Sequence, residues 1–308
     1  MAFPERPLLR PGTLVTRRGD GHLQIGLDAP RAMVVPDDGD TRRFLDGLAS
    51  GGFPEVTPMV ARLADALLEH GLLIDAVDFR ASLDQRPQAA QSVAATFAHG
   101  NLEGGRLLTR RAERPVRVEV CLPPADAGLD WLGLATGLLS LQGVPDAGTP
   151  VVHLVIHGGE PDRERVDEFA RTEQPHLLLS ASEGFVNLGP FVVPGVTACL
   201  RCVDAHRGEL DPRRALVVEQ HAHARGPRPD GLPMPLDPAV MTAAVAWAIR
   251  DVVSFVDDEM PTTWSSTIRF GPGMQQAHTP WQRHARCGCS WAQVQPPPYD
   301  ENGIEATG

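Results

Sequence analysis

The chain contains no lysine, since all 28 of its basic residues are arginine. Walker-type phosphate loops, Schiff-base enzymes and nucleotide-transfer sites that depend on a lysine ammonium are therefore excluded, because arginine cannot replace a compact, titratable charge. The formal net charge is −11, so a phosphate backbone would have to be held against net repulsion. Nucleic acid is therefore not an expected partner.

The sequence also lacks an apolar run of membrane-spanning length. Its longest apolar helical pattern, residues 237–255, is interrupted by Arg250 and Asp251, which indicates a core or interface helix. The N-terminus, MAFPERPLLRPG, has arginine and proline where a secretory signal carries its apolar core. We therefore expect a cytoplasmic protein that makes no membrane contact.

A chain of 308 residues that is 42% hydrophobic is long enough for two domains. We expect the first over residues 1–80 and the second over 114–292. Residues 81–113 are rich in Ala, Gln, Arg and Gly, which predicts a linker with some helix. Residues 293–308 lack apolar periodicity and predict a disordered tail.

The sequence of the first domain predicts strands followed by helices. Apolar runs in residues 13–27 flank a Gly-Asp-Gly turn at 19–21, which predicts a β-hairpin. A third short strand is expected at 31–36, and amphipathic helices at 41–49 and 58–70. This order is winged-helix-like.

Three uses of such a domain can be compared. DNA recognition is disfavoured, because residues 1–80 hold nine arginines against twelve acidic residues. The domain could merely pack on its neighbour, since apolar helix stripes are usually core. It could also act as a peptide clamp, in which an open strand edge accepts an extended peptide beside a helix. The expected clamp residues are Met33, Val34 and Val35 on the strand and Met59, Arg62, Leu63 and Ala66 on the helix.

The strand and helix order, with the hairpin RRGDGHLQIGLD, resembles the precursor-peptide recognition domain of biosynthetic clusters for ribosomally made, modified peptides. The resemblance implies that the ligand is a precursor or leader peptide. From the clamp residues we expect an acidic, Leu-containing peptide, because Met59 can pack against varied apolar anchors and Arg62 prefers a carboxylate.

The second domain alternates strands and helices, which predicts an α/β fold with buried parallel strands. The strands are expected at 116–122, 151–157, 176–182 and 264–270, with extended chain at 185–193; the helices are expected at 129–141, 162–172 and 237–255.

Four of the five cysteines form two short hooks. Cys199 and Cys202 make Cys-x-x-Cys, and Cys287 and Cys289 make Cys-x-Cys. Two hooks of two thiolates are what a tetrahedral structural zinc requires. Because Cys-x-Cys is tighter than usual, His284 stays open as a substitute ligand.

Residues 176–202, HLLLSASEGFVNLGPFVVPGVTACLRC, and the final Cys-Gly-Cys resemble ThiF and MoeB adenylyltransferases of the ubiquitin-activating-enzyme-like superfamily. The resemblance implies a Rossmann-type sheet, a structural zinc and a homodimer. With the clamp, the whole chain is most similar to cyclodehydratase-associated ThiF-like proteins, which bind leader peptides for azoline-forming YcaO enzymes.

The sequence departs from active members of that superfamily. After the first strand it has CLPPADAGLDW, where Pro123 and Pro124 remove amide donors and only Gly128 remains, so the phosphate-binding loop is missing. A second strand with its acidic ribose ligand is also missing, since only nine residues, 142–150, separate the first helix from the next strand. ATP is therefore not an expected cofactor.

We thus expect a degenerate ThiF-like pseudoenzyme that binds a precursor peptide and docks a modifying enzyme. The alternative is an ATP-dependent adenylyltransferase or cyclodehydratase component acting on a peptide, for which the resemblance implies roles for Glu160 and Arg165. A DNA-binding regulator is a third possibility, which the charge opposes.

Overall fold

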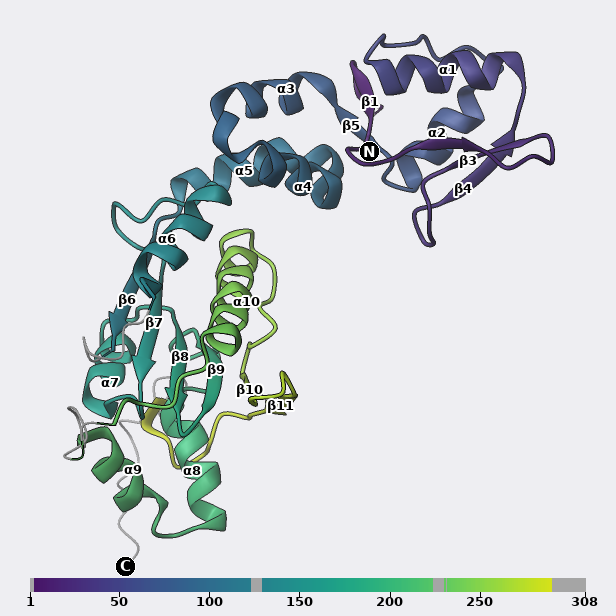
Figure 1. Ribbon diagram of the computed structural model, residues 1–308. Helices are drawn as coiled ribbons and strands as arrows, with labels where there is room; N and C mark the ends of the chain where they lie inside the picture. The colour runs from purple at the N-terminus through teal and green to yellow at the C-terminus, as the bar shows by residue number, and fades with distance from the viewer. Residues whose placement is uncertain (1–2, 123–128, 224–229, 231, 290–308) are drawn as a thin grey trace, which may run out of the picture. The chain divides into compact units, whose positions relative to one another are not determined.

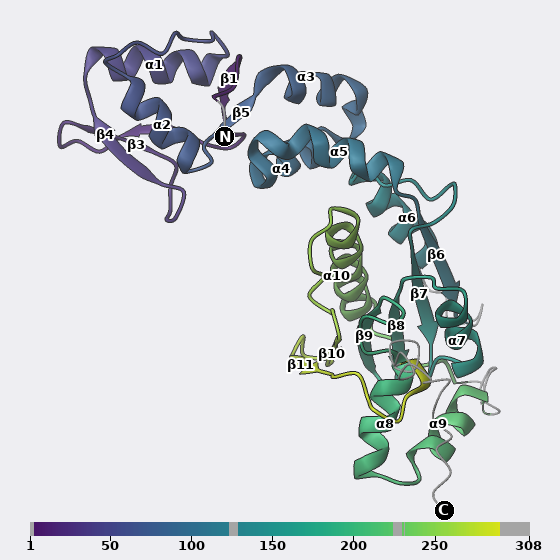
Figure 2. The same ribbon diagram turned by 180° about the vertical axis from the view of Figure 1, so that it is seen from behind.

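The computed structural model describes residues 3–122, 129–223, 230 and 232–289, and the chain forms two compact units (Figure 1, Figure 2). Unit 1 comprises Met1–Glu113 and Leu141–Val144, and unit 2 comprises Arg114–Ser140 and Pro145–Gly308. The expected disordered tail lies outside the described residues. So does the proline-containing segment 123–128 after the first strand of the second domain.

Unit 1 contains two small antiparallel sheets, ordered β2-β3-β4 and β1-β5, and five α-helices in its described part. The strands are β1 (Pro7–Leu9), β2 (Val15–Arg17), β3 (His22–Ile25), β4 (Met33–Pro36) and β5 (Leu73–Asp75). The helices are α1 (Gly39–Ser50), α2 (Ala61–Glu69), α3 (Ala76–Gln85), α4 (Ala90–Gly100) and α5 (Gly104–Glu113), with 3-10 turns η1 (Pro87–Ala89) and η2 (Asn101–Glu103).

The local sequence explains the first part of unit 1. Gly19 and Gly21 take positive φ in the β2-β3 turn, as a tight hairpin requires. Asp38 caps α1 by accepting from two backbone N–H groups. Apolar side chains of the sheet and of both first helices form one core, in which Ile25 and Leu45 are fully buried. The expected three strands and two helices are present in order, and β1 and β5 are additional.

Residues 81–113 differ from the expected linker with some helix around 88–97, because they form parts of three packed helices. Helices α3, α4 and α5 pack on one another around Ile74, Val93, Phe97 and Leu108. Gly104 permits this packing, since a Cβ there would lie 2.6 Å from the Phe97 ring. So few large apolar residues hold the helices together that composition alone indicates a linker.

Unit 2 is a mixed α/β structure built on a six-stranded sheet of order β11-β10-β9-β8-β7-β6. Strands β6, β7 and β8 are parallel, whereas β9, β10 and β11 are antiparallel to their neighbours. The strands are β6 (Val116–Cys121), β7 (Val152–Gly158), β8 (His176–Ser182), β9 (Phe185–Val192), β10 (Ser266–Phe270) and β11 (Gln276–Pro280). The helices are α6 (Trp131–Leu141), α7 (Arg163–Arg171), α8 (Leu200–Leu210), α9 (Arg214–His223) and α10 (Pro238–Val256).

Strands β7, β8 and β9 of the unit 2 sheet are buried on both faces. Val155 and Leu178 pack on one face with Val166, Phe169 and Leu200 of α7 and α8. Alternate residues of the same strands point to the other face, and α10 runs along β7, β8 and β9. Helix α10 is long and apolar enough to cross a membrane, but 56% of its apolar window is buried. This agrees with the expected core helix.

Burial of one histidine predicts acid sensitivity. His176 packs against Phe169 at the start of β8, and burial lowers its pKa from 6.5 to about 4. Because folding lowers the pKa of His176, the contribution of this residue to the stability of the fold is complete above pH 6.5. It is lost as the pH falls towards 4. We expect a loss of about 3 kcal/mol of stability over this window. Urea unfolding of wild type and His176→Leu measures it.

The His176→Leu variant should have a markedly flatter pH dependence between 6.5 and 4. Carboxylates with lowered pKa, such as Glu119, contribute mainly below this window, because they begin to protonate near their unfolded value of 4.5. The same change at exposed His22 is the control. Parallel pH profiles for wild type and His176→Leu would contradict the assignment.

Candidate functional site

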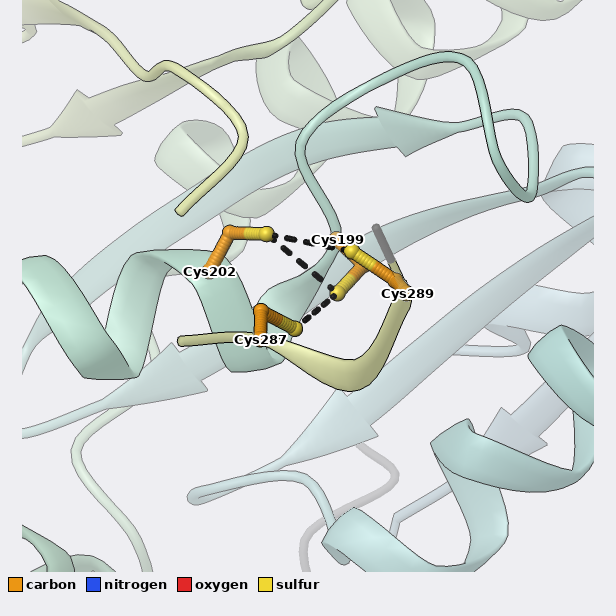
Figure 3. A group of neighbouring side chains, drawn as sticks. All are labelled: Cys199, Cys202, Cys287 and Cys289. Carbon is orange, nitrogen blue, oxygen red and sulfur yellow. Dashed lines mark hydrogen bonds between the residues drawn. The ribbon is translucent and has the colours of Figure 1, made fainter. Parts of the chain in front are cut away.

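The four cysteines that sequence spacing selected come together in unit 2 (Figure 3). Sγ of Cys199 lies 3.7 Å from that of Cys202 and 3.6 Å from that of Cys287. Sγ of Cys202 lies 3.4 Å from that of Cys289. These distances exceed a disulfide bond of about 2 Å and approach the edge of about 3.8 Å of a tetrahedron with zinc–sulfur bonds of about 2.3 Å. The donor set therefore fits a tetrahedral zinc ion.

Electrostatics within the cluster also call for a cation. Hydrogen bonds from the neighbouring thiols hold the pKa of Cys202 well below its usual range, while contacts with Cys202 and Cys287 raise that of Cys199. Ionisation of one thiol thus disfavours ionisation of its neighbour. Four thiolates can coexist here only when a metal ion compensates their charge.

Two chain segments position the cysteine cluster. Cys199 is the N-cap of α8 and Cys202 lies in its first turn, so one helix start presents both thiols on the same side. Cys287 and Cys289 follow the hairpin β10-β11. Trp281 packs against the cluster and donates through its indole N–H to Thr267. A metal would therefore join the end of the sheet to α8.

His284 does not replace a cysteine. Its backbone N–H donates to Sγ of Cys202 at 3.3 Å, whereas its Nε2 lies 3.0 Å from Glu209 Oε1. Its Nδ1 accepts from the N–H of Arg286, which makes Nε2 the protonated nitrogen. His206, Glu209 and His284 lie close enough to be considered as a second metal group. However, His206 Nε2 bonds Gln282 O, so these hydrogen bonds already use the ligand atoms.

The expected clamp strand, β4, is at the edge of its sheet and pairs only with β3 among the described strands. The N–H of Asp37 donates to Gly21 O at 2.9 Å. Because hydrogen-bonded pairs alternate along an antiparallel ladder, the next such pair is Val35 with Leu23. Val34, between them, turns its N–H and C=O away from β3. Val34 as a whole is 48% exposed.

The other clamp residues lie at the start of α2. The helix begins at Ala61, three residues later than expected, because Val60 takes the N-cap position without a side-chain bond. Met59 therefore lies in the preceding turn and is 77% exposed, not on the helix. Arg62 is exposed and has no ion pair to any described residue. Leu63 is half-buried against the same core that holds Met33 and Val35, and Ala66 is also half-buried.

Glu160 and Arg165 lie where β7 leads into α7, but ion pairs occupy both. Arg163, 3% exposed, donates to Glu160 at 2.5 Å and to Asp204 at 2.7 Å. Burial opposes its charge, yet these carboxylates raise its pKa. Arg165 donates to Glu119 at 2.6 Å. Arg163 is the central residue of the network with Glu160 and Asp204, and no local sequence pattern singles it out.

A cavity of about 1,210 Å³ lies beside the cysteine cluster, between α7, α8 and the segment that carries Cys287. Its charged lining includes Arg171, Arg201 and Asp204. Arg201 is paired with Asp167 at 2.7 Å. Sequence reasoning missed this cavity, because its lining comes from segments far apart in the chain whose proximity no local pattern indicates.

No protein-family model matches the chain, and no curated protein matches it. Several solved structures do match the chain. The heterocyclase TruD aligns with a TM-score of 0.64 at 18% identity, over 93% of this chain and 43% of TruD. A heterocyclase in complex with substrate and cofactor gives 0.63 at 16% identity, over 93% of this chain and 39% of that one.

The third structure is Escherichia coli MccB with succinimide, with a TM-score of 0.59 at 11% identity over 92% of this chain and 99% of MccB. At these identities the likeness shows the fold alone. The chain thus has the fold of heterocyclase and MccB structures. It spans about two fifths of the length of the two heterocyclases.

Proposed function

We propose that this chain is a non-catalytic scaffold that binds a precursor or leader peptide, or an extended segment of a partner protein, by strand addition at β4. The observation that carries the proposal is the open edge of β4. Val34 directs its N–H and C=O outwards. Exposed Met59 lies in the turn before α2 and exposed Arg62 in the first turn of α2, the helix that shares a core with β4. An extended peptide would gain backbone hydrogen bonds from the edge and side-chain contacts from these residues.

The comparisons support a role in peptide modification. One neighbour is a heterocyclase with substrate and cofactor, and another MccB structure contains MccA. Because the chain matches only about two fifths of the heterocyclases, the partner we propose is a YcaO-type enzyme that supplies the remaining part. The resemblance to ThiF and MoeB adenylyltransferases further implies that the scaffold is a homodimer with a structural zinc.

Three features favour a scaffold over an enzyme. The chain has no lysine. In the described residues only one helix, α6, stands between β6 and β7. Arg163 closes the end of β7 by binding both Glu160 and Asp204, so the carboxylate that a nucleotide or its metal would need is already engaged. The segment 123–128 that would approach the phosphates lies outside the described residues.

The test is fluorescence anisotropy with labelled precursor peptides encoded beside this gene. Binding to an acidic, Leu-containing leader with a dissociation constant in the micromolar range or tighter is expected. An adjacent YcaO-type gene would identify the pathway. Salt-dependent binding of duplex DNA by unit 1, with no peptide bound, would instead favour a regulator.

The second candidate function is ATP-dependent activation of a peptide, favoured by an MccB structure that contains ATP and by the place of Glu160 and Arg165 at the end of β7. We expect ATP with Mg²⁺ at about 1 mM to leave the melting temperature unchanged, because a ligand that binds only the folded state must raise it. Differential scanning fluorimetry measures this shift. A dose-dependent rise would reverse the order of the two functions.

A further inference from the structure

A second cavity in unit 2, of about 500 Å³, lies at the amino ends of strands β6 and β7. Arg114 and Val151, which precede these strands, line one side of it, and the end of α10 with the segment that follows lines the other. Glu160 and Arg165 lie beyond the opposite end of β7, so this cavity is separate from their ion pairs. Its size suits a small molecule or two neighbouring side chains of a peptide.

The apolar wall of this cavity consists of aromatic side chains and one methionine. Phe255 and Trp264 both pack on Phe191, which is fully buried, with ring centroids 4.9 Å and 6.3 Å from that of Phe191. The two lining rings are therefore held in place before a ligand arrives. Met260 is 74% exposed, and its flexible side chain can adapt to the shape of a ligand. Such a wall binds apolar side chains and attracts cations to the faces of its rings.

The charges beside the aromatic wall favour a cationic ligand. The last turn of α10 contains no basic residue, and exposed Asp258 and Glu259 follow it at the rim of the cavity. Arg114 pairs with Asp258 and donates to Val256 O at 2.8 Å, so one guanidinium group is already bound here. Glu259 has no ion pair to any described residue. Because the negative end of the α10 dipole also lies here, a second cation would be stabilised beside Glu259.

We propose that this cavity binds a peptide segment in which an arginine or lysine stands beside an aromatic or aliphatic residue. The apolar side chain packs against Phe255, Trp264 and Met260, and the cation lies near Glu259. The net charge of −11 favours the approach of such a segment. The proposal does not depend on peptide binding at β4, where we expect an acidic peptide, so the two sites have opposite charge preferences.

Isothermal titration calorimetry with the blocked dipeptide N-acetyl-Phe-Arg-amide tests the proposal. Wild type should bind it with a dissociation constant of about 0.1 mM or tighter. The analogue with citrulline in place of arginine has nearly the same shape but no charge, and should bind at least about fivefold more weakly. N-acetyl-Ala-Arg-amide, which lacks the aromatic ring, should also bind at least about fivefold more weakly.

Substitutions in the cavity separate the two parts of the recognition. Glu259→Gln should reduce the preference for arginine over citrulline to about twofold or less. Glu183→Gln is the matched control, because Glu183 is exposed in the β8-β9 turn, outside the cavity lining, and should keep the wild-type preference. Met260→Ala should weaken binding of both the arginine and the citrulline dipeptide about threefold, since it removes apolar surface from the wall. Circular dichroism and zinc content confirm that each variant is folded.

Three results would overturn the proposal. The first is no binding of N-acetyl-Phe-Arg-amide to wild type at about 1 mM. The second is equal affinity of wild type for the arginine and citrulline dipeptides. The third is a folded Glu259→Gln variant with the same preference as Glu183→Gln, which would mean that the cation lies elsewhere on the acidic surface.

Discussion

Changing Cys199 or Cys287 to serine is expected to release the metal and to lower the melting temperature of unit 2 by roughly 10–20 °C. Binding to a structural zinc site contributes on the order of 10–16 kcal/mol in isolated zinc fingers. Here the buried sheet remains without the metal, so we expect a loss on the order of 5 kcal/mol. For a domain of this size each 1 kcal/mol shifts the midpoint by about 2–4 °C.

The metal content of the wild type is the direct measurement. Elemental analysis of freshly purified, reduced protein should give about one zinc per chain. Cys121→Ser is the matched control, because Cys121 ends β6 and is the described cysteine that does not belong to the cluster. This control should keep its zinc and its melting temperature. Peptide binding at β4 should be the same in all three variants.

Two results would contradict the zinc assignment. The first is the absence of metal from reduced wild-type protein. The second is an equal loss of stability in Cys121→Ser and Cys199→Ser, which would mean that serine disturbs packing at any cysteine. A metal other than zinc would preserve the cluster as a metal site but change its chemistry.

Local patterns predicted most elements of the fold. The apolar runs of β7 and β8 identified buried parallel strands, and the Gly-Asp-Gly turn identified the β2-β3 hairpin. The sequence did not predict helices α3 to α5 as three packed elements, because their small core gives only a weak apolar periodicity. Strands β1 and β5 are three residues long, which is too short for alternation to be read.

The candidate site, too, could be predicted from the sequence only in part. Cysteine spacing predicted the cluster of four cysteines, since the two thiols of each short hook are close in any fold. The choice between His284 and a cysteine could not be made from sequence, because it depends on the contacts of His284 with Glu209 and Arg286. Likewise, Arg163 binds Asp204, 41 residues away, and no local pattern reports such a pair.

Val34→Pro is expected to weaken peptide binding at least about tenfold. The substitution removes the outward N–H, and its ring obstructs an incoming strand. A lost backbone hydrogen bond costs about 1 kcal/mol, and the obstruction adds to it. The β3-β4 ladder does not use this N–H, so unit 1 should stay folded. Anisotropy titration with the leader peptide measures the change.

Arg17→Pro is the matched control for Val34→Pro. Arg17 lies on β2, the opposite edge of the same sheet, and Leu23 is its register partner. Arg18 N–H donates to His22 O at 3.0 Å, so the alternation of the ladder turns the N–H of Arg17 outwards as well. Both variants thus place proline at an equivalent edge position, and only the β4 change should reduce affinity. Equal affinity for both, in proteins with wild-type circular dichroism, would mean that the peptide does not bind at β4.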